Sequence, residues 1–165
     1  MAEQMSDQIH FDWLQGRASL GAASGWTAEE MRLVADLGYA LALQGRNEEA
    51  VTIFEGLAAL APATAYFQSA LGALRLRLGD AARALEHLEA ALAADPQDIA
   101  ALVNRAEARL QLGELATALA DLQLALRLGE TKKDEASASS VTRARALLSR
   151  WQNSSGERAL QLREI

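Results

Sequence analysis

The sequence predicts an all-α protein, a right-handed α-solenoid of three repeated helical hairpins with a further helix at each end. The first supporting observation is the composition, because half of the residues are hydrophobic but only 5% are aromatic. Alanine and leucine supply most of the apolar content, and both favour helix over strand. The second is a fixed spacing of 34 residues within two sets of small residues, Gly45, Gly79 and Gly113, and Ala50, Ala84 and Ala118. The third is that no segment shows the sustained polar–apolar alternation of a strand.

A period of 34 residues is the length of the tetratricopeptide repeat, a pair of antiparallel helices that stacks on its neighbours. The register places the repeats at residues 31–64, 65–98 and 99–132. Each first helix carries a small residue, at Gly38, Gly72 and Ala106. Each second helix carries a large apolar residue, at Phe54, Leu88 and Leu122, and the first two repeats end near a proline, Pro62 and Pro96. A small residue lets two helices approach closely, and the large residue fills the remaining space. The glycine that ends each first helix supplies a left-handed backbone conformation.

Flanking segments complete the predicted solenoid. Residues 1–30 hold a short N-terminal helix over residues 6–15 and a Gly/Ser/Ala connector, and Thr27 with Glu30 forms a capping box that opens the first repeat helix. Residues 133–152 form a polar loop and a capping helix, which covers the exposed face of the last repeat. The apolar stripe of that helix is Val141, Ala144, Leu147, Leu148 and Trp151. Residues 153–165 are expected to be a disordered tail.

Charge and composition exclude several classes of function. The formal net charge of −6 argues against nucleic acid or an anionic membrane as a partner. The chain has no cysteine, which excludes a disulfide scaffold, thiol catalysis and a cysteine-based zinc site. No apolar run approaches the roughly 18 residues of a membrane span, and the N-terminus lacks the features of a secretory signal. We therefore expect a cytoplasmic protein without membrane insertion.

The sequence offers no catalytic, cofactor-binding or metal-binding set of residues. His10 and His87 are far apart and lack ligand-spaced partners, and no phosphate-binding glycine loop or nucleophile elbow is present. The carboxylates have helix-surface spacing and are expected to be solvated: Glu48, Glu49, Asp80, Glu86, Glu89, Glu107 and Asp121. The expectation is a protein that is not an enzyme and needs no cofactor.

The first helices of the three repeats should line a concave, peptide-binding groove. Its predicted lining is small, apolar and mildly polar: Ala35, Tyr39, Ala42, Tyr66, Ser69, Ala73, Leu76, Val103, Asn104 and Glu107. This lining suits an extended apolar peptide, although the two tyrosines could equally pack within the stack. The basic clamp that holds acidic heat-shock C-termini is missing, because Ala35 and Tyr39 occupy its first positions.

With the register fixed, four segments resemble one family of three-repeat proteins, the class II chaperones of type III secretion. The segments are WLQGRASLGAASGWTAEEM (residues 13–31), LQGRNEEAVTIFEGLAAL (43–60), YFQSALGALRLRLGD (66–80) and NRAEARLQLGELATA (104–118). The resemblance implies a stoichiometric chaperone that keeps hydrophobic translocator proteins soluble and secretion-competent by binding an extended segment in the groove. It also implies a homodimer through the N-terminal region, in which Phe11, Trp13 and Trp26 are the candidate interface residues, with an intramolecular cap as an equal alternative. The alternative function is a generic tetratricopeptide scaffold that assembles another bacterial complex.

Overall fold

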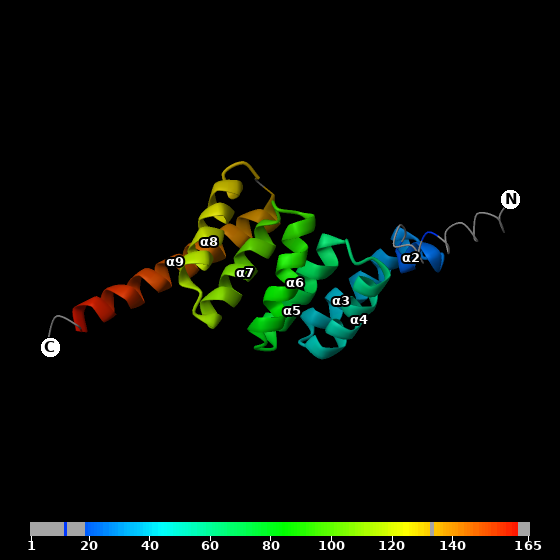
Figure 1. The fold of residues 1–165 in the computed structure, drawn as a ribbon, viewed down its shortest axis with the longest axis horizontal. Coiled ribbons are helices and arrows are strands. Elements are labelled where there is room, and N and C mark those ends of the chain that lie inside the picture. The colour runs from blue at the N-terminus through cyan, green and yellow to red at the C-terminus, as the bar shows by residue number, and fades with distance from the viewer. Residues whose placement is uncertain (1–11, 13–18, 133, 162–165) are drawn as a thin grey trace.

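Three antiparallel helical hairpins, stacked side by side, make up the centre of the molecule (Figure 1). The computed structural model describes residues 12, 19–132 and 134–161, with side chains as far as Gln152. Within this part of the chain there are only helices and no strand. The elements in order are α2 (Leu20–Ala23), α3 (Ala28–Leu43), α4 (Asn47–Leu60), α5 (Ala65–Arg77), α6 (Ala81–Ala94), α7 (Ile99–Leu112), α8 (Leu115–Gly129) and α9 (Glu135–Gln161). The predicted all-α solenoid is confirmed.

The predicted helix boundaries follow from local chemistry. The Thr27 hydroxyl accepts from the Glu30 backbone N–H at 3.2 Å, and the Glu30 carboxylate accepts from the Thr27 N–H at 2.8 Å. This capping box begins α3 at Ala28, slightly before the expected repeat start. After α3, α5 and α7 the chain turns through a glycine with φ near +80°: Gly45, Gly79 and Gly113. That conformation is open to glycine because it has no Cβ.

Close contact within each hairpin comes from the paired small and large residues. A Cβ built on Gly38 would lie 2.9 Å from Phe54 Cε2, and one built on Gly72 would lie 2.4 Å from Leu88 Cγ. In the third hairpin, Ala106 stands in place of the glycine and is fully buried, as is Leu122. The helices of a pair therefore approach to a distance that only the smallest side chains permit.

The core lies between the helices and divides into two clusters along the stack. One cluster is shared by α3, α4 and α5 and includes Phe54, Leu57 and Leu71. The other extends from α5 to α9 and includes Leu88 and Leu102. The helix α9 packs against α7 and α8, with its side chains Val141, Ala144 and Leu147 buried. It covers the apolar face that the last hairpin would otherwise expose.

Two expectations about the ends of the chain need comment. The helix α9 continues to Gln161, so most of the expected disordered tail, residues 153–161, is helical. The physical reason is that no proline interrupts this stretch and its single glycine, Gly156, costs only about 1 kcal/mol in a helix. The predicted N-terminal helix over residues 6–15, with Phe11 and Trp13, lies outside the described residues except for Asp12.

Candidate peptide-binding groove

Two adjoining hollows lie against the first helices of the hairpins. The larger, about 390 Å³, lies between α3, α5 and α7. Its lining is Tyr39, Ala42, Phe54, Tyr66, Ser69, Ala70, Ala73, Leu74, Arg77, Asp98, Ala100 and Asn104. The smaller, about 280 Å³, lies between the N-terminal halves of α3 and α5, and its lining is Ala28, Met31, Arg32, Ala35, Asp36, Thr64, Tyr66 and Phe67. Because Tyr66 lines both hollows, we refer to them together as the groove.

Tyr66 stands at the centre of the groove and is held there by aromatic contacts. Its ring meets Phe54 edge-on at a centroid distance of 6.0 Å, and it meets Phe67 in the same manner at 5.9 Å. Burial raises the pKa of the Tyr66 hydroxyl, and the neighbouring Asp36 and Tyr39 raise it further. Tyr66 nevertheless keeps about half of its surface exposed. Tyr66 therefore packs within the stack and also lines the groove, so both alternatives considered for the tyrosines apply to it.

Most of the predicted groove residues line one of the two hollows. The larger hollow contains Tyr39, Ala42, Tyr66, Ser69, Ala73 and Asn104, and the smaller contains Ala35. The structure thus brings together side chains from three helices that are far apart in the sequence. Their shared character is small or aromatic, with a polar group at the α7 end.

The structure corrects the prediction for Leu76 and Val103. Leu76 is 9% exposed and Val103 is 1% exposed, and both belong to the core cluster that extends from α5 to α9. Both residues lie where α7 contacts its neighbours, since α5 packs on α7 and α7 packs on α9. The contacts between these helices bury the two side chains, so they leave almost no surface that a ligand could contact.

Glu107 also departs from the predicted pattern. It does not line either hollow; its carboxylate forms an ion pair with Arg143 of α9. The other guanidinium nitrogen of Arg143 donates to Asn104 Oδ1 at 2.7 Å. The α7 end of the groove is therefore bounded by a side chain from the C-terminal helix.

Sequence reasoning missed several residues that line the two hollows, among them Phe54, Leu74 and Asp98. Phe54 was expected to fill the space between repeats, and its ring does contact Tyr66 and Phe67 of the next repeat, but it also lines the groove. Asp98 precedes α7 and accepts from the Ala101 backbone N–H at 3.0 Å. Its position before a predicted helix start was a signal for this cap, though not for a place in the groove.

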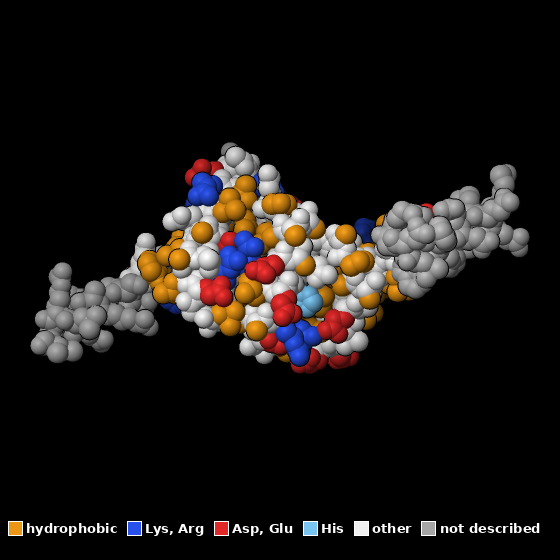
Figure 2. Space-filling view, viewed as in Figure 1, with side chains coloured by type: hydrophobic (Ala, Val, Ile, Leu, Met, Phe, Trp, Pro, Cys, Tyr) orange, Lys and Arg blue, Asp and Glu red, His pale blue; other side chains and the backbone are white. Residues whose placement is uncertain are grey.

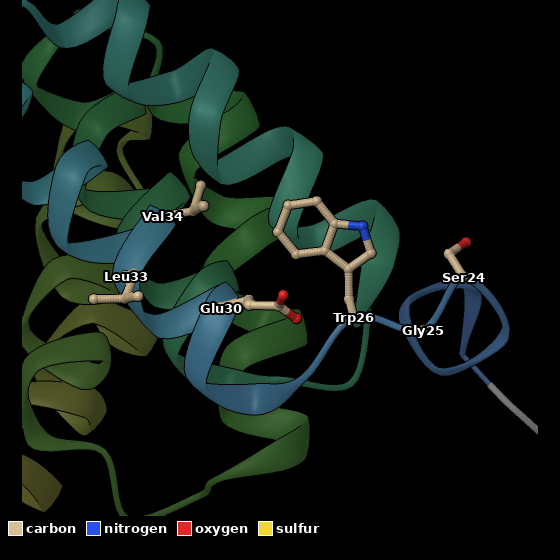
Figure 3. Close-up of a pocket in the computed structure, with 6 residues that line it drawn as sticks. All are labelled: Ser24, Gly25, Trp26, Glu30, Leu33 and Val34. Carbon is tan, nitrogen blue, oxygen red and sulfur yellow. The ribbon is translucent and has the colours of Figure 1, made fainter.

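A separate hollow lies beside the N-terminal end of the stack. Figure 3 shows its lining residues, which are Ser24, Gly25 and Trp26 in the turn before α3, and Glu30, Leu33 and Val34 on α3. Trp26, Leu33 and the nearby Leu37 are exposed large apolar residues. Trp26 is thus accessible, as an interface residue must be, whereas the other two candidate interface residues lie outside the described part of the chain.

The imidazole of His87 has a polar partner within the stack. His87 is half-buried, and its Nδ1 lies 2.9 Å from Gln68 Oε1. Burial lowers the pKa of the His87 imidazole, as does the positive charge of Arg75. Over the described residues, there is no grouping of three or more His, Cys, Asp or Glu side chains that could hold a metal ion. In the same part of the chain, no helix combines the length and apolar character needed to span a membrane.

Asp121 is the one expected surface carboxylate that is deeply buried. Its side chain is 6% exposed, and it accepts two hydrogen bonds from Arg105, at 2.7 and 2.9 Å, and one from Arg109 at 2.8 Å. The expectation of a solvated carboxylate was wrong here because two arginines of α7 face this position of α8. Such a site is costly to break, because removing one charge leaves the others buried without compensation.

Arginines also connect successive hairpins in a repeated pattern. Arg75 of α5 pairs with Glu55 of α4 at 2.5 Å, and Arg109 of α7 pairs with Glu89 of α6 at 3.5 Å. Both the two arginines and the two glutamates are 34 residues apart. Figure 2 shows one face of the stack, on which Lys/Arg and Asp/Glu side chains lie next to one another between hydrophobic side chains. The face shows no extended patch of one charge.

The helical hairpins, their left-handed glycines and the groove on the first helices define a tetratricopeptide-type solenoid. The chain matches no family model. A type III secretion complex from Aeromonas hydrophila is 27% identical with a TM-score of 0.77, covering 87% of this chain and 95% of that one. PcrH of Pseudomonas aeruginosa, solved with the chaperone-binding region of PopD, is 26% identical with a TM-score of 0.71, covering 79% and 97%. PcrH has also been solved with the corresponding region of PopB.

The translocator chaperone SycD of Yersinia enterocolitica shares the fold, with a TM-score of 0.70 at 23% identity over 80% of this chain and 97% of that one. The chain is therefore similar, over most of its length, to type III secretion translocator chaperones, and the predicted resemblance is confirmed. A second relative is protein FlbA of Caulobacter vibrioides, 33% identical over 99 residues. That match covers 60% of this chain but only 17% of FlbA, so the chain spans about a sixth of that protein.

Proposed function

We propose that this chain is a non-catalytic cytoplasmic chaperone that holds an extended, apolar segment of a type III secretion translocator protein in its groove. Bound in this way, the translocator stays soluble and competent for secretion. The observation that carries the proposal is the groove itself, with Tyr39, Tyr66 and the small side chains around them. It lies in a chain whose fold matches PcrH, a protein solved with bound regions of PopB and PopD.

The physical logic is that a protein made to enter membranes exposes apolar surface that aggregates in water. An apolar groove covers part of that surface while the rest of the chain stays unfolded. The small residues Ala42, Ala70 and Ala73 leave room for the ligand's side chains, and the rings of Tyr39 and Tyr66 give flat apolar contact.

Co-expression with the hydrophobic proteins encoded beside this gene tests the proposal. The chain should keep such a protein in the soluble fraction as a complex. Ala73→Glu, which puts a charge into the larger hollow, and Tyr39→Ala should each release the bound protein. Ala90→Glu, on the exposed surface of α6, is the matched control and should leave the complex intact. Thermal unfolding of each variant shows whether its fold is retained.

The second candidate function is a tetratricopeptide scaffold that assembles folded proteins of another bacterial complex. The match to part of FlbA, a much longer protein, keeps this candidate in view, because it shows that a similar sequence also occurs as one part of a larger protein. A folded partner that binds equally well to the Ala73→Glu and Tyr39→Ala variants would support the scaffold and contradict the chaperone.

We further propose that the chain forms a homodimer through the surface around Trp26. SycD has been solved in two structures, one of them described as an alternative dimer. The exposed apolar residues Trp26, Leu33 and Leu37 give this end of the stack the character of an interface. Light scattering should report a dimer that dissociates in the Leu33→Glu, Leu37→Glu double variant.

A further inference from the structure

One positively charged side chain on the wall of the groove has no counter-ion. Arg77, the last residue of α5, lines the larger hollow and is exposed to solvent. Within the part of the chain that the structure describes, its guanidinium forms neither an ion pair nor a hydrogen bond. The nearest carboxylate along the chain, Asp80, accepts from the Arg83 backbone N–H at 3.1 Å and pairs with the Arg83 side chain at 3.5 Å. Arg77 therefore presents an unpaired positive charge to the hollow.

The packing of the hairpins does not account for Arg77. Arg75, two residues earlier, pairs with Glu55 of α4 at 2.5 Å, and this arginine recurs in the third hairpin as Arg109. Two residues along a helix are about 200° of rotation apart, so Arg77 lies on the other side of α5 from that pair. The residues at the position of Arg77 in the other two hairpins carry no charge: Leu43 and Gln111. Arg77 is therefore not part of the ion-pair pattern that Arg75 and Arg109 share.

The two charged residues of the larger hollow lie at its opposite ends. Tyr66 and Arg77 are near the two ends of α5, which places them about 16 Å apart along the helix axis. The first helices run in the same direction, so Asp98, which precedes α7, lies at the Tyr66 end (Figure 1). The Asp98 carboxylate also caps α7, where it accepts from the Ala101 N–H at 3.0 Å. The charge of Arg77 is thus not offset by Asp98.

We propose that Arg77 is a specificity-determining residue of the groove, and that it pairs with the carboxylate of an acidic residue in the bound translocator segment. This inference rests on the proposed function, because it names a side chain that the ligand carries. A ligand that covers the hollow removes water from the guanidinium, and a charge that loses water without gaining a partner costs free energy. A carboxylate offsets that cost, since hydrogen bonds between charged groups are stronger than those between neutral ones.

The other lining residues indicate what stands next to this acidic residue in the ligand. Ala73 lies one turn, about 6 Å, before Arg77 on α5, and with Ala42 of α3 it leaves room for an apolar side chain. Side chains on one side of an extended peptide are two residues, about 6.7 Å, apart. For a segment that lies along α5, the spacing therefore fits an apolar residue and an Asp or Glu two positions apart.

The probe is the shortest peptide of the co-expressed translocator that binds the wild-type chain. Arg77→Met removes the charge but keeps a long side chain, and it should weaken peptide binding about fivefold, the upper value for a partly exposed ion pair. Arg77→Lys keeps the charge and should retain most of the affinity. Arg145→Met makes the same change on the exposed surface of α9, outside the groove, and is the matched control that should bind like the wild type. Thermal unfolding checks that each variant keeps its fold.

A double-mutant cycle identifies the partner of Arg77 on the peptide. Each Asp or Glu of the peptide is changed singly to Asn or Gln, and one of these changes should weaken binding to the wild type about fivefold but leave binding to Arg77→Met unchanged. A peptide with Lys at that position should bind Arg77→Glu better than the unmodified peptide does. Wild-type affinity in Arg77→Met, an equal loss in Arg145→Met, or losses that simply add across the cycle would overturn the inference while leaving the chaperone intact. Failure of the wild-type chain to bind any translocator peptide would instead overturn the proposed function.

Discussion

The contact between Gly72 of α5 and Leu88 of α6 gives the most direct test of how the two helices of a hairpin pack against each other. A Cβ placed on Gly72 would lie 2.4 Å from Leu88 Cγ and 2.7 Å from Cδ2, far inside ordinary contact distance. Gly56 offers the matched control, because it also lies within a helix, yet a Cβ placed there meets nothing within 4 Å. The two substitutions Gly72→Ala and Gly56→Ala therefore make the same chemical change in opposite surroundings.

The magnitudes separate the two variants clearly. Replacing a glycine inside a helix with alanine stabilises it by about 0.5–1 kcal/mol, so Gly56→Ala should raise the free energy of unfolding by that amount. Gly72→Ala gains the same helix preference but also overpacks the core, which costs about 1–3 kcal/mol. Leu88 is fully buried, and its Cγ cannot move away by rotation of the terminal methyl groups alone. The cost should therefore lie in the upper part of that range, which leaves Gly72→Ala less stable than the wild type.

Urea unfolding followed by circular dichroism measures this difference. With a slope of about 2 kcal/mol per molar urea, the midpoints of the two variants should differ by about 1 M. Leu88→Ala should relieve the clash, so Gly72→Ala should be much less harmful in that background than in the wild type. The packing argument would be refuted by a Gly72→Ala midpoint equal to that of Gly56→Ala.

Three further predictions concern charge and the groove. Asp121→Asn should lower the free energy of unfolding by about 3 kcal/mol or more, because it leaves two arginines without their buried partner. Glu49→Gln should leave it almost unchanged, since the pair of Glu49 with Arg46 is exposed to solvent. Because the pKa of the His87 imidazole is lowered in the folded state, protonation favours the unfolded chain. The free energy of unfolding should therefore decrease as the pH drops below 6.5, the ordinary pKa of histidine, and it should decrease less in His87→Gln. A series of urea midpoints at different pH values measures this. Ala42→Phe should fill the larger hollow and weaken peptide binding in calorimetry, whereas Ala90→Phe on the outer surface should not.

The parts of the fold that the sequence predicts correctly are those in which a residue acts locally. A glycine after each first helix and the capping box at Thr27 work through their own backbone and nearest neighbours. The pairing of Gly72 with Leu88 is longer in range, but the 34-residue period repeats it at Gly38 with Phe54. Because the pairing recurs at the 34-residue period, these positions could be predicted from the sequence alone.

The groove lining was harder to predict because it depends on how neighbouring hairpins are rotated against each other. Val103 occupies a position of the first helix that was expected to face the groove, but the contacts of α7 with α5 and α9 cover it. The period offered a signal for the arginine pairs, since Arg75 and Arg109 are in register. The 34-residue period gave no signal for the buried ion pair of Asp121, because the residue at the same position in the second hairpin is His87.

The size of the groove limits how tightly it can hold a ligand. Two or three buried side chains contribute about 3–9 kcal/mol, and the ordering of a flexible peptide offsets much of that gain. The resulting dissociation constant is micromolar or weaker. With an association rate constant of about 10⁵–10⁷ M⁻¹s⁻¹, a micromolar complex loses its peptide at about 0.1–10 per second. A complex of this strength releases its peptide spontaneously within seconds, so under the proposed function a competing binding site would be enough to take over the translocator.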